Sequence, residues 1–222
     1  MKEIKIDKII RSKRKTIALV VAADATLLVR APFESTLEYI KEIIFKKRFW
    51  INEKKRIANK NGAIVHNKEF VNGEGFLYLG TTYKLKIQNC DDIRLEDYLF
   101  FPEKYLNKPQ EKMVEWYKKK ALGKIRERAD WYSKNTGWKY KSIKINDAQS
   151  RWGSCGPSGS LNFTWRLIMA PINVIDYVIV HELAHLHEKN HSVRFWNKVK
   201  TVLPNYEQRE KWLKENRKFL NI

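Results

Sequence analysis

The chain has 222 residues, 43% of them hydrophobic and 13% aromatic, which excludes a disordered protein and allows one large domain or two small ones. Lys and Arg outnumber Asp and Glu by 44 to 25, so the formal charge is +19 and nucleic acid is a partner to test. No apolar run reaches the roughly 18 residues of a membrane span, no signal peptide is evident, and two distant cysteines exclude a disulfide scaffold, so we expect a cytoplasmic protein without membrane contact.

The first part of the chain predicts strands, then a helix, then strands again. Alternating or β-branched runs predict a small antiparallel meander with strands over 3–10, 16–22 and 26–30. Ser35 and Glu38 have the spacing of a capping box, which predicts a helix from about 36 to 59. Further on, FVNGEGFLYLGTTYKLKI predicts two strands around a turn at Gly80, and 93–101 predicts another strand.

One stretch, from Pro102 to Pro109, resembles a linker. We therefore expect a β-rich region with one helix over 1–106 and a second domain over 107–222, unless the two form one compact unit. The second region predicts a long amphipathic helix over 110–134, followed by strands over 141–147 and 161–170. An apolar helix should then follow Pro171, and two amphipathic helices should come after it.

The segment after Pro171 contains HELAH, which matches the motif HExxH. His181 and His185 lie four residues apart on a helix and project from the same side, so both imidazoles can reach one ion. Glu182 lies about 100° round the helix, where it can reach a water on that ion without being a ligand. The preceding helix, 172–180, is apolar on nearly all sides, so burial of these side chains is costly unless something satisfies them. The alternative is a pair of core histidines with ordinary hydrogen bonds.

Three nearby residues are candidates for a third ligand. His187 points away from the first two histidines on an intact helix, so it fits a supporting or surface position. Glu188 returns to their side and could replace or orient a ligand, but it leaves little room for a substrate. If the helix ends at about Lys189 and the chain turns at Asn190, His191 can reach the ion. We therefore select His191.

Three neutral nitrogen ligands leave one tetrahedral position for water, which is the arrangement of a catalytic zinc site. Zinc lowers the pKa of such a water, and Glu182 can take its proton. No redox-active ligand set is evident, which favours zinc over iron or copper. The sequence thus predicts a zinc-dependent hydrolase of peptide bonds. The alternatives are a nucleic-acid-associated protein or DNA-linked protease that uses the basic surface, and metal-dependent amide hydrolysis of a small molecule.

Several motifs together resemble one family. The runs RWGSCGPSGSLNFTWRLIMAP and VIDYVIVHELAHLHEKNHSVRFW, with the strand RSKRKTIALVV and the hairpin YLGTTYKL, are similar to the YgjP-like metallopeptidase-domain family, relatives of the SprT-like zinc proteases. The resemblance implies a zincin-like α+β fold, in which the active-site helix packs under a small mixed or antiparallel sheet. It also implies zinc on His181, His185 and His191, with Glu182 catalytic. It implies no particular substrate.

In such zincins a sheet strand beside the active-site helix commonly binds peptide. The expected strand here lies within 160–168 and includes Asn162. Arg151 and the backbone of Gly153 and Ser154 could steady an oxyanion or a peptide terminus, although RWGSCG could equally be a packed turn. We therefore expect a peptide or protein substrate.

Overall fold

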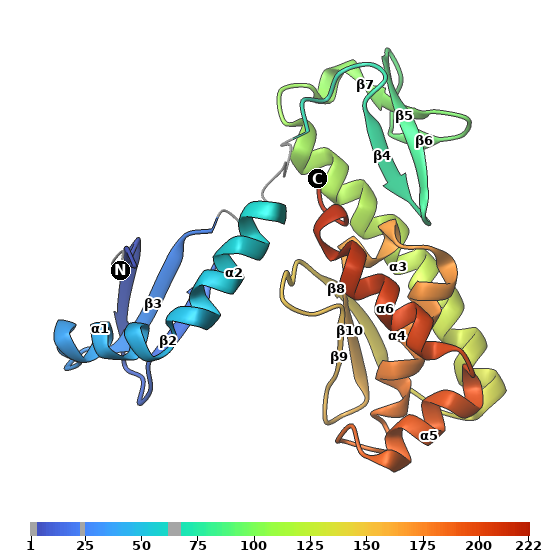
Figure 1. The fold of residues 1–222 in the computed structure, drawn as a ribbon. Helices are drawn as coiled ribbons and strands as arrows, with labels where there is room; N and C mark the ends of the chain where they lie inside the picture. The colour runs from blue at the N-terminus through green and yellow to red at the C-terminus, as the bar shows by residue number, and fades with distance from the viewer. Residues whose placement is uncertain (1–3, 23–24, 62–67) are drawn as a thin grey trace. The chain divides into compact units, whose positions relative to one another are not determined.

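The computed structural model describes residues 4–22, 25–61 and 68–222, which belong to two compact units (Figure 1). The units divide between residues 66 and 67. The boundary that we expected near residue 106 therefore falls inside the second unit. The reason is a shared core, because Phe76 and Phe101 of the β-rich segment are buried in one cluster with Met113 of the following helix.

The first unit contains a three-stranded sheet. Its strands are β1 (Lys8–Ser12), β2 (Ala18–Val21) and β3 (Leu27–Pro32). They lie in the order β1-β3-β2, with β1 parallel and β2 antiparallel to β3, so the predicted antiparallel meander is wrong. Arg11 contributes to the parallel pairing, because its guanidinium donates to the backbone carbonyls of Phe33 (2.9 Å) and Ser35 (2.7 Å) and so holds the ends of β1 and β3 together.

Two helices, α1 (Leu37–Lys46) and α2 (Arg48–Asn61), follow the sheet where the sequence predicted one. The break falls at Lys47. The N-cap of α1 is Thr36 and not Ser35, since the Thr36 hydroxyl accepts the Tyr39 N–H at 3.2 Å. The helices and the sheet share one small core, formed by Leu27, Val29, Ala31, Ile40, Ile44 and Ile51.

The second unit begins with a four-stranded sheet in the order β4-β5-β7-β6. The strands are β4 (Gly75–Tyr78), β5 (Thr81–Gln88), β6 (Arg94–Leu95) and β7 (Leu99–Pro102), followed by the 3-10 helix η1 (Glu103–Tyr105). The predicted hairpin around Gly80 is confirmed, and Gly80 has a left-handed φ of 84°. Its N–H donates to the carbonyl of Met169 at 3.0 Å, which ties the hairpin to the segment before the HExxH helix.

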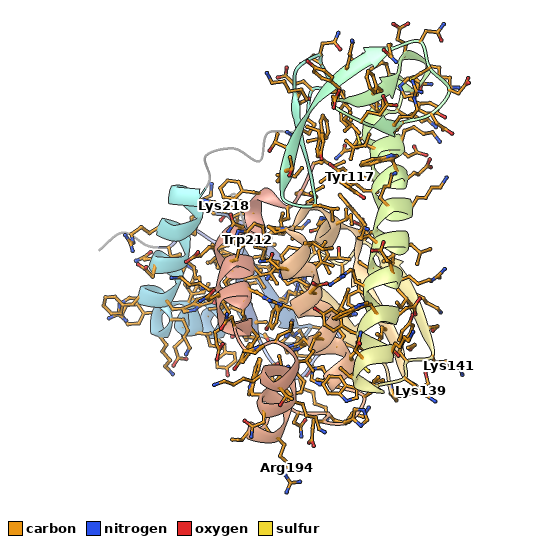
Figure 2. All side chains as sticks on the ribbon, turned by 90° about the vertical axis from the view of Figure 1, so that its right-hand side faces the viewer. Tyr117, Lys139, Lys141, Arg194, Trp212 and Lys218 are labelled. Carbon is orange, nitrogen blue, oxygen red and sulfur yellow. The ribbon has the colours of Figure 1, made fainter. Side chains whose placement is uncertain are left out.

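The predicted long helix is α3 (Pro109–Thr136), which ends at Gly137 in the left-handed conformation. Its buried face holds Met113, Tyr117 and Ile125. The hydroxyl of Tyr117, labelled in Figure 2, donates to the carbonyl of Leu77 at 2.7 Å and joins α3 to β4.

The next sheet lies beside the candidate site. It consists of β8 (Ser142–Asn146), β9 (Gly153–Cys155) and β10 (Ser160–Thr164). The order is β8-β10-β9, with β10 parallel to β8 and antiparallel to β9. The predicted strand over 161–170 stops at Thr164, and the 3-10 helix η2 (Trp165–Met169) follows. The indole N–H of Trp165 donates to the carboxylate of Asp147 at 2.6 Å. This hydrogen bond fixes the Trp165 side chain at the end of β8.

Three helices and a short 3-10 turn come last: α4 (Ile172–Ala184), α5 (Val193–Val202), α6 (Tyr206–Asn216) and η3 (Arg217–Phe219). Helix α4 is central, because it packs against α3, α6 and strand β9. Arg128 of α3 binds Asp176 of α4 through two bonds of 2.7 Å. The predicted α+β class is confirmed. None of the helices within the described ranges combines the length and apolar character that crossing a membrane requires.

Candidate functional site

Three histidine side chains converge at the end of α4. The Nε2 atom of His191 lies 3.0 Å from Nε2 of His181 and 3.2 Å from Nε2 of His185. Potential ligand atoms of all three lie within 4.8 Å of one another. The convergence brings together residues that come from different local structures, since His181 is helical and His191 lies beyond a turn.

The chain reverses after α4 and returns His191 to the helix. Helix α4 ends at Ala184, with His185 as its C-cap, and not at about Lys189 as the sequence predicted. The early end is stabilised by the carbonyl of Glu188, which lies 2.9 Å from Nδ1 of His185 and fixes that ring. After the turn Ser192 caps α5, where its hydroxyl accepts the Phe195 N–H at 3.4 Å.

The spacing of the three rings, and the lowered pKa of two of them, suit a divalent metal. Tetrahedral zinc with bonds of about 2.0–2.1 Å places its ligand nitrogens about 3.3 Å apart, close to the two distances observed. Ligation also requires neutral imidazoles. Burial, together with the neighbouring His185 and His191, lowers the pKa of His181 to about 3. Burial also lowers the pKa of His185. The donor set therefore fits zinc.

The other predicted histidine and glutamate positions lie outside the cluster. The ring of His187 contacts Trp138, with centroids 5.7 Å apart. Glu188 contributes its backbone carbonyl, whose oxygen lies within hydrogen-bond distance of Nδ1 of His185. The remaining histidine of the chain, His66, for which the sequence predicted no role, lies outside the described residues. His181, His185 and His191 are thus the only His, Cys, Asp and Glu side chains that form a metal-sized group in the described part of the chain.

Glu182 is buried beside the histidines, with 5% of its surface exposed. It lies against Gly153 of β9, where a Cβ atom would stand 2.7 Å from both Cγ and Oε1 of Glu182. Burial raises the pKa of this carboxyl to about 8, while the positive charge of Arg151 acts in the opposite direction. The glycine therefore leaves room for the buried carboxyl group of Glu182, and the charge of Arg151 acts on that group.

The strand that borders α4 is β9 and not the strand we expected. Strand β10 lies between β8 and β9, so both of its edges are already paired and it cannot accept a peptide. Asn162 is on this central strand, opposite Ser154 of β9. The edge strand β9 packs against α4 and carries Gly153 and Ser154. Of the predicted substrate residues, Arg151, Gly153 and Ser154 thus lie on or next to this edge.

Sequence reasoning missed an aromatic support for the histidine rings. The buried Phe195 ring contacts all three, with its centroid 4.5–4.9 Å from theirs. Trp196 stacks on His191 at 5.6 Å and 22°, and Tyr206 stacks on Trp196 at 5.0 Å and 13°. A signal for this was present, because FW follows the third histidine within one helical turn of the Ser192 cap.

Two solved structures are similar to part of the chain. A search of curated proteins gives no match. Among solved structures, the chain is similar to the metallopeptidase zymogen abylysin of Pyrococcus abyssi, with 17% identity, a TM-score of 0.38, and coverage of 41% of this chain and 93% of that one. It is also similar to the metallopeptidase zymogen jannalysin of Methanocaldococcus jannaschii, with 21% identity, a TM-score of 0.37, and coverage of 43% and 96%.

The family comparison covers nearly the whole chain. The model of the YgjP-like metallopeptidase domain matches residues 15–216, which include the hairpin around Gly80, strand β9 and the entire histidine cluster. The chain therefore belongs to the YgjP-like metallopeptidase-domain family and is a metallopeptidase.

Proposed function

We propose that this metallopeptidase holds zinc on His181, His185 and His191 and hydrolyses peptide bonds with Glu182 as the general base. The convergence of the three rings carries the proposal, because Nε2 of His191 lies 3.0 Å from Nε2 of His181 and 3.2 Å from Nε2 of His185, distances close to those between the ligands of a tetrahedral zinc ion. An all-nitrogen set of three ligands leaves a fourth position open, as catalytic zinc sites require.

When bound, zinc would lower the pKa of a water at the open position and polarise the substrate carbonyl. Glu182 is the residue that can move the proton. Its carboxyl is buried next to the cluster, so its ionised form can accept a proton from the attacking water and deliver it to the leaving amine. The three histidines would hold the ion, and the packing of Phe195 and Trp196 fixes the orientation of the His191 ring.

We assign the substrate to the free edge of β9. An extended peptide can pair with this edge through backbone hydrogen bonds, which would carry its carbonyl past the C-terminal end of α4. Arg151, Gly153 and Ser154 lie there, and the Arg151 guanidinium can hold a substrate oxygen or terminus. We assign no substrate contact to Asn162, because it belongs to the fully paired strand β10.

Metal analysis and one isosteric substitution test the proposal. Purified protein should contain about one zinc per chain, measured by plasma mass spectrometry, and should cleave unfolded casein. Glu182→Gln should keep the zinc and lower kcat by about 10²–10⁴-fold, because an amide cannot accept the proton. Full activity of Glu182→Gln would remove Glu182 from the mechanism. A protein that hydrolyses casein without any bound metal would contradict the role of the histidines.

Nucleic-acid binding is a second candidate, supported by the formal charge of +19. A gel-shift titration with duplex DNA at two salt concentrations tests it, since electrostatic binding weakens steeply as salt rises. We also propose a cytoplasmic location, which is supported by Cys90 and Cys155, because both are free thiols and a reducing compartment preserves them.

A further inference from the structure

The first unit contains a groove that the histidine chemistry does not use. Its volume is about 1400 Å³, and it lies between the segment 4–9, which leads into β1, and one side of α1 and α2. We call it the β1 groove. Its aliphatic lining consists of Ile4, Ile6, Ile9, Leu37 and Ile44.

The β1 groove reaches the unpaired edge of the sheet at the start of β1. Strand β1 lies at the end of the order β1-β3-β2, so one of its edges pairs with β3 and the other has no strand within the described ranges. All six consecutive residues of 4–9 line the groove. Lys8 and Ile9 are the first two residues of β1, and the Asp7 N–H before them already donates to the Leu27 carbonyl at 3.1 Å, so the groove reaches the unpaired edge at the start of β1. One more strand beside the start of β1 would enter this groove.

The rim of the β1 groove is basic. Its cationic lining residues are Lys5, Lys8, Lys41, Arg48 and Lys55. Asp7 is the one acidic residue of the lining, and its carboxylate already accepts the Leu27 N–H at 2.6 Å and lies 3.5 Å from Lys55. The whole unit, residues 1–66, has 16 Lys and Arg against 7 Asp and Glu. The charge of the groove is therefore complementary to an acidic ligand.

We propose that the β1 groove binds an extended acidic peptide as an added strand beside β1. Apolar side chains of the peptide would enter the aliphatic floor, and acidic side chains, which alternate with them, would meet the basic rim. Single-stranded nucleic acid fits less well. Arg48 lies 4.4 Å from the ring centre of Phe45 and 4.6 Å from that of Phe49, so a guanidinium already covers one face of each ring on which a base could stack.

Such a site would give the peptidase a place to hold a protein chain that is separate from the residues of the histidine cluster. The inference does not depend on the proposed zinc mechanism, because the site binds without hydrolysis. Binding is best measured on the full chain carrying Glu182→Gln, which cannot destroy the probe by the proposed mechanism. If Glu182→Gln still cleaves casein but binds the probe, the mechanism fails and the groove proposal stands.

The probe is a fluorescein-labelled peptide of about eight residues, the usual length of a strand, in which Val and Glu alternate. Fluorescence anisotropy should give saturable binding. Methylation of alternate backbone nitrogens should weaken binding at least about tenfold, since it removes the strand-pairing donors. Replacement of Glu by Lys in the probe should abolish binding. Equal affinity for the methylated peptide would overturn the added-strand geometry.

Leu37→Asp is the variant of choice, because Leu37 lines the groove, is 44% exposed, and is the first residue of α1, where an acidic side chain favours the helix. It should weaken probe binding at least about tenfold with unchanged circular dichroism. Leu106→Asp is the matched control, since Leu106 has a similar exposure of 42% and belongs to the second unit. The proposal would be overturned if the two variants weakened binding equally or if the probe did not bind. It would also be overturned if the protein bound a dT oligonucleotide that the peptide did not displace.

Discussion

Gly153 of β9 and Glu182 of α4 are in such close contact that any side chain on the glycine would meet the carboxylate. A Cβ atom on Gly153 would stand 2.7 Å from Cγ and Oε1 of Glu182 and 2.9 Å from its Cδ. Real Cβ contacts do not reach 3.0 Å, so one of the two groups must move. The position of the proposed base is therefore set by the residue opposite it on an edge strand.

Gly153→Ala should displace the Glu182 side chain and lower kcat by about 10–100-fold, because a small misplacement of a catalytic group is costly. Zinc content should stay unchanged, since the histidines are not touched. Gly123→Ala is the matched control: an added Cβ at Gly123 meets nothing within 4 Å, and the residue lies inside α3. That variant should keep full activity and gain about 0.5–1 kcal/mol of stability. Wild-type activity of Gly153→Ala would show that the contact does not position the base.

His191→Ala should lower zinc affinity by more than about 100-fold, because it removes one of three ligand nitrogens. His187→Ala is the matched control, because His187 lies four residues away in the chain and packs against Trp138. It should leave zinc affinity unchanged. Competition with a chromogenic chelator measures both values. Zinc loss in His187→Ala, or its retention in His191→Ala, would contradict the ligand set.

Trp196→Leu should weaken zinc binding by about 10-fold, since Trp196 stacks on His191 and holds that ring in place without contacting the ion. Trp131→Leu is the control, because Trp131 is 52% exposed and its ring contacts Tyr132 and not a histidine. Circular dichroism separates this effect from unfolding. Equal zinc affinity in Trp196→Leu and wild type would show that the stack does not position the ligand.

Local patterns in the sequence predicted the convergence of the histidines better than they predicted the pairing of distant segments. The four-residue spacing of His181 and His185 and the apolar helix before them depend only on helix geometry, and both are found in α4. His191 was selected for the right reason, a turn, although the helix ends at Ala184 and not near Lys189. The contact between the Glu188 carbonyl and the His185 ring gives a physical reason for that early end. No pattern of residues in the sequence predicts this contact.

Pairing between distant segments could not be predicted in the same way. The sequence placed Asn162 on a peptide-binding strand, but β10 is paired on both sides because β8 and β9 flank it. Likewise, the order β1-β3-β2 depends on which strands meet in space, and alternation of side chains is the same for either order. The boundary near 106 failed for a related reason, since Phe76 and Phe101 share a core with α3.

The ion pair between Arg128 and Asp176 joins α3 and α4, the two longest helices of the second unit, and gives a test of the scaffold that is separate from the chemistry. Asp176 is 6% exposed and accepts two bonds of 2.7 Å from the Arg128 guanidinium. Arg128→Met should lower the free energy of unfolding by about 2–4 kcal/mol, because it leaves a buried carboxylate without its partner. The double variant Arg128→Met/Asp176→Leu should recover most of that loss, since both charges are then gone. Urea denaturation followed by circular dichroism measures each value. A double variant as unstable as Arg128→Met would show that packing, and not the unpaired charge, accounts for the loss.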